Sequence, residues 1–238
     1  MGRLAASFSL IVFAVFAAGC ARTTAPVAPT PLLAPTLSPF PNPSEAKFVT
    51  LVSADLRKRF PSPKTAIDAG YFRYTAEDDA GIITYTNLRW FSDDPKHPTQ
   101  LWYDAKGRLI GADFTMPVWD RAKRPAVWGL QPDRWVHFIE HVHYVVRGAD
   151  GQERYGSLFN AVFEKNGGNP AHPAAQPLVR AGIAKRAGDV RHVFLLPEIW
   201  ITSFWVIPNP KGAFADTNPG VTPAKRRHQN AHPMQMTP

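Results

Sequence analysis

Proline limits what this chain can fold into more than any other residue. It accounts for 24 of 238 residues, about twice the average usage. Residues 21–43 read ARTTAPVAPTPLLAPTLSPFPNP, with a proline every few positions. Proline lacks a backbone N–H and disfavours helix in the residue before it, so this segment is predicted to be extended. We interpret it as a tether, which at about 3.1 Å per residue reaches up to about 70 Å.

The rest of the chain divides into a folded middle and a tail. Residues 44–218 are long enough to bury a core of their own and are predicted to form a single globular domain. The hydrophobic fraction of the whole chain, 45%, is ordinary for a globular protein. Residues 219–238 are polar, basic and contain proline. We therefore expect them to form a poorly ordered tail.

The first part of the domain has the pattern of two helices. Ser44 is a residue that can cap a helix, apolar residues follow at helical spacing, and Pro61 ends the run. Ser62 and Pro63 give a second helix start, after which apolar positions continue to Tyr74. The sequence therefore predicts two N-terminal helices.

From residue 82 onward the pattern changes to strands. The expected strands cover 82–90, 101–104, 109–116, 142–147, 154–162 and 199–207. Turn-forming residues at 105–107 and 148–151 indicate hairpins. The last strand is apolar on both faces and should be central, and a third helix is expected over 174–186. All seven tryptophans lie in or beside these strands and are assigned to the core. This order predicts an α+β fold, with N-terminal helices packed on a mainly antiparallel, hairpin-built sheet.

The N-terminus has the pattern of an export signal. Residues 4–18 are apolar except for Ser7 and Ser9. Fifteen helical residues span about 22 Å, which is short of the ~30 Å hydrocarbon core of a membrane. Residues 1–19 are therefore interpreted as a signal peptide.

The only cysteine, Cys20, follows this leader directly and excludes an internal disulfide. The run Ala17-Ala18-Gly19-Cys20 resembles the lipobox of bacterial lipoproteins, although that family prefers leucine at the position of Ala17. The resemblance implies that Cys20 becomes the new N-terminus and carries fatty acids such as palmitate, which anchor residues 20–43 firmly to a membrane. With Ala21 next, it implies the outer membrane, facing the periplasm, in a Gram-negative cell. In other cells it implies the extracellular face of the cell membrane.

The charge balance is basic, with 27 Lys and Arg against 19 Asp and Glu and a pI near 9.8. Basic surfaces attract anionic lipids, cell-wall polymers and nucleic acids. Because the chain is predicted to be exported, we do not expect nucleic acid to be a partner. We expect the basic run at 225–228 to let the tail contact anionic lipid or cell-wall polymer.

A histidine cluster at residues 137–143 is the main chemical feature. On a helix, His137, Glu140 and His141 match the inverted zinc-protease motif, with Glu140 as a general base. On a strand, His141 and His143 share one face about 6.6 Å apart, and two imidazoles can bind one metal at about 2.0–2.1 Å each. His137 would then lie about 13 Å from His141 and join them only through a bulge. Residues 142–146 favour the strand.

A metal site would need a third ligand, for which His97, His192, Asp113 and Glu198 are the candidates. Without a metal, the histidines form the polar face of a half-exposed strand. The sequence contains no G-x-S-x-G, P-loop, G-x-G-x-x-G or C-x-x-C motif. The His-x-His strand and the Asn-Pro turns between 208 and 220 resemble uncharacterised secreted bacterial proteins, a resemblance that implies no activity.

Two functions remain open. The first is a membrane-anchored, non-enzymatic lipoprotein of the cell envelope that binds a partner or small ligand. The alternative is a metal-binding lipoprotein or metalloenzyme that uses His141 and His143, with His137 in addition, to hold a transition metal such as zinc.

Overall fold

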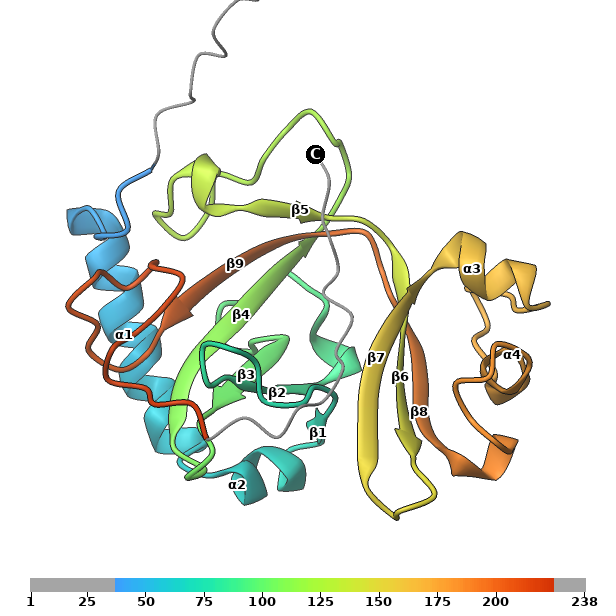
Figure 1. Cartoon of the computed structure of the whole chain (residues 1–238). Helices are drawn as coiled ribbons and strands as arrows, with labels where there is room; N and C mark the ends of the chain where they lie inside the picture. Colours follow the sequence, from blue (N-terminus) through green and yellow to red (C-terminus); the bar gives the residue numbers. More distant parts are fainter. Residues whose placement is uncertain (1–36, 225–238) are drawn as a thin grey trace, which may run out of the picture. The chain divides into compact units, whose positions relative to one another are not determined.

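The computed structural model describes residues 37–224. The predicted signal peptide, Cys20, residues 20–36 of the predicted tether and the part of the predicted tail from residue 225 lie outside the described residues. Two N-terminal helices precede antiparallel sheets built from hairpins, which confirms the predicted α+β class (Figure 1).

Within the described residues, nine strands form two sheets. The larger sheet has six strands in the order β1 (Phe72–Arg73), β2 (Ile83–Thr86), β3 (Gln100–Tyr103), β4 (Leu109–Pro117), β9 (Ile199–Trp205) and β5 (Val136–Phe138). The smaller sheet has the order β7 (Glu153–Phe159), β6 (His141–Arg147) and β8 (Val190–Leu196). The helices are α1 (Pro43–Arg59), α2 (Pro63–Asp68), α3 (Asn160–Lys165) and α4 (Ala175–Arg180), with 3-10 turns η1 (Leu88–Trp90), η2 (Pro132–Arg134) and η3 (Ala187–Asp189).

Helix α1 begins two residues earlier than predicted. Its cap is Asn42 rather than Ser44, because Asn42 and Glu45 satisfy each other's backbone N–H in a capping box while Pro43 occupies the first turn. The predicted cap of α2 at Ser62 is confirmed. This helix ends at Asp68 and does not continue to Tyr74, because Gly70 adopts a positive φ of 90° that turns the chain into β1.

Three other segments differ from their predicted extent. Strand β7 ends at Phe159, and residues 160–165 form α3, where Phe163 packs against Val142 and Leu178. Helix α4 is shorter than predicted, with Pro177 in its first turn as expected and Gly182 at positive φ after its end. The predicted 82–90 strand ends at residue 86, and a 3-10 turn follows it. Both predicted hairpin turns are confirmed.

The two faces of the six-stranded sheet have different chemistry. Successive residues of a strand point to opposite faces. Leu101, Phe114 and Phe204 pack with Leu56 of α1 in one core cluster, so α1 covers this face. The opposite face, referred to as the polar face, carries Gln100, Asp113 and Ser203 at alternate positions of β3, β4 and β9, beside Trp102 and Ile201.

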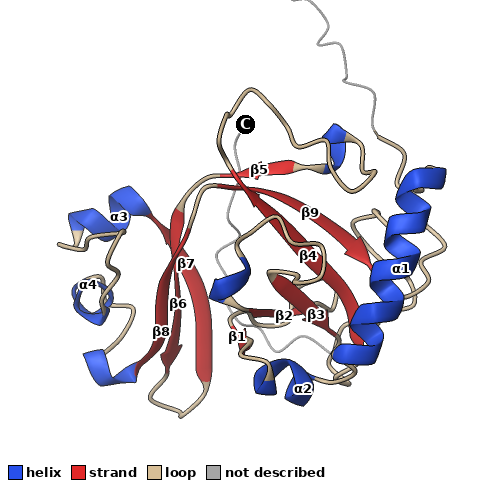
Figure 2. Cartoon of the chain, turned by 180° about the vertical axis from the view of Figure 1, so that it is seen from behind, coloured by secondary structure: helices blue, strands red, loops and turns tan. Residues whose placement is uncertain are grey.

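The two sheets are joined by one two-stranded ribbon. Strands β5 and β9 pair as far as Phe138 opposite Ile199, and β6 and β8 pair from His141 opposite Leu196. Only residues 139–140 and 197–198 separate the two ladders, so both chains pass between the sheets side by side (Figures 1 and 2). This crossing brings the first residues of β6 close to the polar face of the larger sheet.

A buried ion pair fixes the start of α1. The Arg134 guanidinium donates to both carboxylate oxygens of Glu45 at 2.9 and 3.0 Å, and its own side chain is 4% exposed. Burial raises the pKa of Glu45, but hydrogen bonds from Arg134, Asn42 and Gln131 together bring it below its usual value. Arg134 also donates to the backbone oxygen of Ser38, so the last residues of the predicted tether contact the fold.

The tryptophans follow the core prediction with one exception. Trp135, Trp200 and Trp205 are buried, and Trp90, Trp102 and Trp128 are partly buried in packed clusters. Trp119, in the loop between β4 and β5, is 86% exposed. Its assignment to the core was wrong, because its side chain is exposed in this loop.

Candidate functional site

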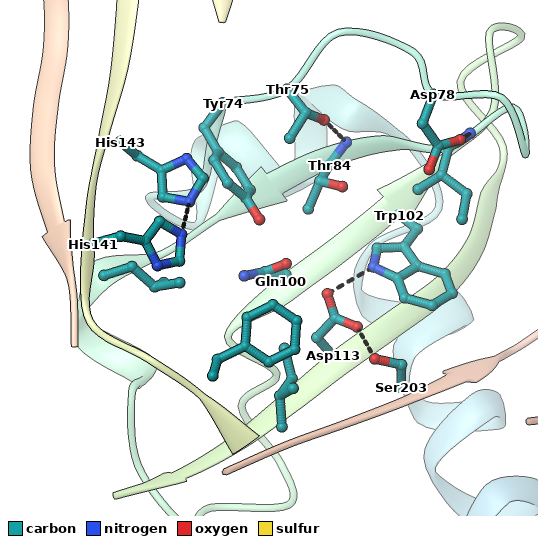
Figure 3. A pocket seen from close by; sticks show the side chains of 14 residues that line it. Tyr74, Thr75, Asp78, Thr84, Gln100, Trp102, Asp113, His141, His143 and Ser203 are labelled. Carbon is teal, nitrogen blue, oxygen red and sulfur yellow. Dashed lines mark hydrogen bonds between the residues drawn. The ribbon is translucent and has the colours of Figure 1, made fainter. Parts of the chain in front are cut away.

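A cavity of about 320 Å³ lies between the polar face of the larger sheet and the smaller sheet (Figure 3). Strands β2, β3, β4 and β9 supply one wall, strands β6 and β8 supply the other, and the segment 74–82 closes one side. The cavity is therefore lined by parts of the chain that are distant in sequence.

Asp113 is the buried acid of this cavity. It lies on β4 between Gln100 of β3 and Ser203 of β9, and the residue is 4% exposed. Its carboxyl accepts hydrogen bonds from Trp102 Nε1 at 2.8 Å and Ser203 Oγ at 2.6 Å. Burial raises the pKa of Asp113 to about 7, while these two hydrogen bonds act in the opposite direction. Near neutral pH the group can therefore both donate and accept a hydrogen bond.

Gln100 and Tyr74 are two polar groups of the cavity that have no hydrogen-bond partner among the described residues. They are 5% and 7% exposed, and Figure 3 shows both side chains between Asp113 and the histidines. Within residues 37–224, no group forms a hydrogen bond with the side-chain amide of Gln100 or the hydroxyl of Tyr74. Among the described residues, the fully buried polar atoms without a partner are Ser53 Oγ, Trp135 Nε1, Asn160 Oδ1 and Thr202 Oγ1, so the Gln100 amide and the Tyr74 hydroxyl are open to the cavity rather than sealed from it. Both groups are therefore placed to bind a ligand.

His141 and His143 face each other in the opposite wall (Figure 3). Their Nε2 atoms are 2.9 Å apart, and His141 Nδ1 lies 2.8 Å from the carbonyl oxygen of Ile139. Burial lowers the pKa of His143 to about 3, and the neighbouring His141 adds to this effect. Burial also lowers the pKa of His141. The prediction that the two histidines lie on one face of a strand is confirmed.

His137 does not join this pair. It lies on β5 in the larger sheet, where its Nε2 is 2.7 Å from Glu198 Oε1 and its ring packs against Trp200. The helical H-x-x-E-H interpretation is wrong, because residues 137 and 141 belong to strands of different sheets. Glu140, the base in that interpretation, accepts a hydrogen bond from Asn160.

The four candidates for a third metal ligand are dispersed. Asp113 lines the same cavity as the histidine pair. Glu198 is paired with His137 and Arg121, His192 stacks on Phe72, and His97 contacts Asp94. Among the described residues, no group of three or more His, Cys, Asp or Glu side chains is arranged to hold a metal ion. The predicted metal site therefore depends on His141 and His143 alone.

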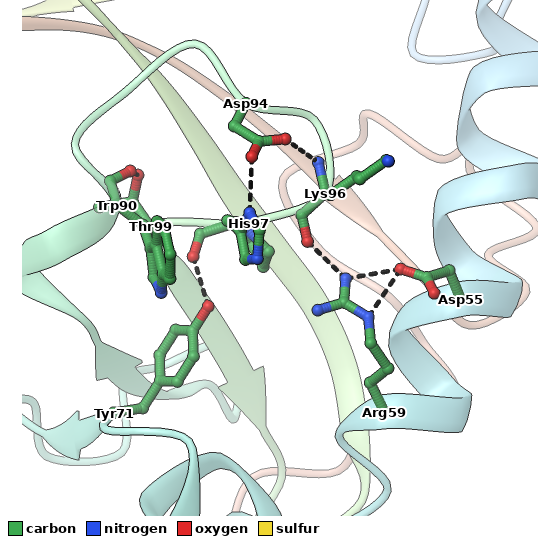
Figure 4. A network of polar contacts seen from close by, with 9 residues as sticks. Asp55, Arg59, Tyr71, Trp90, Asp94, Lys96, His97 and Thr99 are labelled. Atoms are coloured by element: carbon green, nitrogen blue, oxygen red, sulfur yellow. Dashed lines mark hydrogen bonds and ion pairs between the residues drawn. The ribbon is translucent and has the colours of Figure 1, made fainter.

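A second hollow lies beside α1, lined by Asp55, Arg59, Lys96 and His97 (Figure 4). The carboxylate, guanidinium and imidazole groups of this hollow are already paired. Arg59 bonds with Asp55 and with the carbonyl oxygen of Lys96, and His97 Nδ1 lies 2.6 Å from Asp94. The network fastens the 91–99 loop to α1 and is structural.

Sequence reasoning named Asp113 only as one of several unranked ligands and did not identify Tyr74, Gln100, Trp102 or Ser203. One signal was present. Asp113 interrupts the apolar run LIGADFTM. A carboxyl group at the centre of a covered strand destabilises the fold unless hydrogen bonds compensate for its burial, so its presence indicates a functional role. The positions of Gln100 and Ser203 depend on strand register, which the sequence does not display.

In the part of the chain that the structure describes, no helix has the length and hydrophobicity needed to cross a membrane. Comparisons with protein families, with curated proteins and with solved structures found no match to this chain.

Proposed function

We propose that this chain is a membrane-anchored lipoprotein of the cell envelope that binds a small ligand in the cavity between its two sheets, without transforming it. The lipobox-like run ending at Cys20 supports the anchor, and the proline-rich tether provides distance from the membrane. The observation that carries the binding function is that the Gln100 amide and the Tyr74 hydroxyl open into the cavity and have no hydrogen-bond partner among the described residues.

The lining indicates the chemistry of the ligand. Two carboxyl groups, Asp78 and Asp113, line the cavity, and none of its described lining residues is lysine or arginine. Phe138 and Ile201 add apolar surface. A volume near 320 Å³ lies at the small end of ligand pockets. The ligand is therefore small, rich in hydrogen-bond donors, and neutral or cationic.

The arrangement supports binding rather than chemistry. Ser203 donates its hydroxyl hydrogen to Asp113, and neither histidine of the cavity contacts it among the described residues. The described residues of the cavity therefore do not form the usual catalytic arrangement of a nucleophile, a general base and a group that orients the base.

Ligand binding is tested by measuring the melting temperature of the full chain with a panel of small amines, amino acids and neutral sugars. A compound that raises the melting temperature should also bind in calorimetric titration. Gln100→Leu should abolish this binding, whereas Gln152→Leu, the same change at an exposed hairpin turn, should not. The proposal is wrong if no compound binds, or if Gln100→Leu and Asp113→Asn leave the affinity unchanged.

The anchor is tested by mass spectrometry of the mature chain. The expected product begins at Cys20, carries acyl chains and sediments with membranes, whereas Cys20→Ser stays unmodified. An intact leader, or an unmodified start beyond residue 20, would contradict the assignment. Contact of the tail with anionic lipid or cell-wall polymer should be salt-sensitive and should disappear when residues 220–238 are deleted.

A further inference from the structure

The carboxyl group in the cavity has no cationic partner among the described residues. Two uncharged donors hold the Asp113 carboxyl, Trp102 and Ser203, and no lysine or arginine lines the cavity. The other buried carboxyl differs, because Glu45 pairs with the Arg134 guanidinium. Burial raises the pKa of Glu45, but its hydrogen bonds bring that pKa below the usual value, whereas the pKa of Asp113 stays raised. Asp113 would therefore gain the most from a ligand that carries positive charge.

The other ionisable groups of the cavity do not supply that charge. His141 donates from Nδ1 to a backbone carbonyl, so its Nε2 accepts the N–H···N hydrogen bond from His143 at 2.9 Å. Burial lowers the pKa of both imidazoles, that of His143 to about 3, so both rings are neutral at pH 7. Asp78 is a second carboxyl in the lining. The described walls therefore attract cations and repel anions.

Three hydrogen-bond acceptors face the same part of the cavity. Figure 3 shows the Gln100 amide between the Asp113 carboxyl and the Tyr74 hydroxyl. Burial raises the pKa of Tyr74 well above its usual value, and the nearby Asp113 adds to this effect, so the hydroxyl keeps its proton. Its oxygen, the amide oxygen of Gln100 and the remaining lone pairs of the carboxyl can each accept a hydrogen bond. An ammonium group has three N–H donors and no acceptor, which matches this set.

The remaining lining suits a short carbon chain. Phe138, Leu196 and Ile201 line the cavity and pack in one apolar cluster. Ile201 lies two residues from Ser203 on β9, on the same face of the strand. The apolar surface is therefore next to the carboxyl, and a volume of about 320 Å³ limits the ligand to a small molecule.

We propose that the ligand of the cavity is a primary alkylammonium ion, whose charged group binds Asp113, Gln100 and Tyr74 while its carbon chain lies against Phe138 and Ile201. This inference rests on the proposed function, because it names the chemical class of the molecule that the cavity binds. It excludes anions, and it places neutral alcohols and sugars below amines in affinity.

Binding of such a cation is coupled to a proton. The free Asp113 carboxyl has a pKa of about 7, and a cation beside it lowers that pKa. Below pH 7 the carboxyl therefore releases its proton to solvent when the ammonium ion binds. The affinity should rise about 5–10-fold from pH 6 to pH 8. The other titratable groups facing Asp113 are Tyr74, Asp78, His141 and His143, so a variant at Asp113 must isolate its share.

The test is calorimetric titration of the full chain with matched probes at pH 6, 7 and 8. Cyclohexylamine is compared with cyclohexanol, and isopentylamine with isopentyl alcohol. An alkylammonium ion keeps its proton throughout this range, as lysine does with a pKa of about 10.4. At pH 8 each amine should bind at least about 10-fold more tightly than its alcohol. Titration in two buffers of different ionisation enthalpy should show proton release at pH 6 and hardly any at pH 8.

Substitutions assign these effects to residues. Asp113→Asn should weaken amine binding about 10–100-fold, remove its pH dependence and change alcohol binding little. Tyr74→Phe should weaken amine binding about 2–10-fold and keep the pH dependence. Asp68→Asn, the same change at the exposed end of α2, should alter neither. Circular dichroism verifies folding, and if Asp113→Asn does not fold, the preference for amines and the proton release of the parent chain decide.

The proposal is overturned if the alcohols bind as tightly as the amines, if amine affinity is the same at pH 6 and pH 8, or if folded Asp113→Asn binds amines like the parent chain. A neutral compound that binds the parent chain more tightly than any amine, and is lost in Gln100→Leu, would refute the ammonium ligand and support the proposed binding function. If neither amines nor neutral compounds bind, both proposals are wrong.

Discussion

Replacing Asp113 by asparagine should change how the stability of this protein depends on pH. The carboxyl has a pKa of about 7 in the folded chain, against 3.9 in an unfolded chain. Between these values the folded chain keeps the proton and the unfolded chain has lost it. The folded state therefore binds more protons, and stability falls as the pH rises through this window. Above about pH 7 the stability that the protonated Asp113 retains is fully lost, and below about pH 3.9 none of it is lost.

The magnitude follows from the two pKa values. Between pH 5 and pH 8, ionisation of Asp113 should lower the free energy of unfolding by about 2–3 kcal/mol. Asparagine cannot ionise, and it can still accept from Trp102 and donate to Ser203, so the shape of the site is kept. From pH 5 to pH 8, the stability of Asp113→Asn relative to the parent chain should therefore increase by about 2–3 kcal/mol.

Urea denaturation followed by tryptophan fluorescence at pH 5, 6, 7 and 8 measures this difference. Titration of the histidines is common to both chains and cancels in the comparison. Ser203→Ala, which removes one hydrogen bond to the carboxylate, should raise the pKa of Asp113 further and enlarge the difference. Parallel pH profiles for the parent and Asp113→Asn would refute the reasoning that burial controls this carboxyl.

Three further substitutions test the packing of the fold. Arg134→Met leaves the buried Glu45 carboxylate without its partner and should cost about 3–5 kcal/mol in urea denaturation; a loss below 1 kcal/mol would mean that the pair is not buried as described. Gly111→Ala places a methyl group against the Trp102 ring, which should cost about 1–3 kcal/mol and weaken ligand binding, and unchanged values of both would contradict this packing. Trp119→Ala should change stability by less than about 0.5 kcal/mol in the same assay, because the side chain is exposed; a larger loss would show that it packs on the fold.

Local patterns predicted the elements of this fold better than their ends. Ser62 followed by Pro63 marked α2 correctly, and the turn residues at 105–107 and 148–151 located two hairpins. The errors arose where a neighbour with equal local preference was available, as when Asn42 with Pro43 replaced Ser44 as the cap. Strand β7 ended early because packing of Phe163 favours a helix there, and such packing is set by the tertiary structure.

Only the part of the candidate site that comes from residues close in sequence could be predicted. The spacing of His141 and His143 on a strand sufficed to place both imidazoles on one face. Gln100 and Asp113 meet because β3 and β4 pair in one particular register. Tyr74 reaches them from a segment that no spacing rule relates to either strand. The separation of His137 depends on the break after β5, which the continuous run of strand-forming residues concealed.

The crossing between the two sheets also determines how the cavity can be opened. Within residues 37–224 the backbone links the sheets only at residues 139–140 and 197–198, which lie side by side, while Phe72 and Tyr74 contact Phe194 of the smaller sheet. A swing of the smaller sheet about the crossing would part those aromatic rings and leave every strand ladder intact. We expect a bound molecule to enter and leave by this hinge motion about the crossing. The contacts between the aromatic rings would have to break each time the cavity opens.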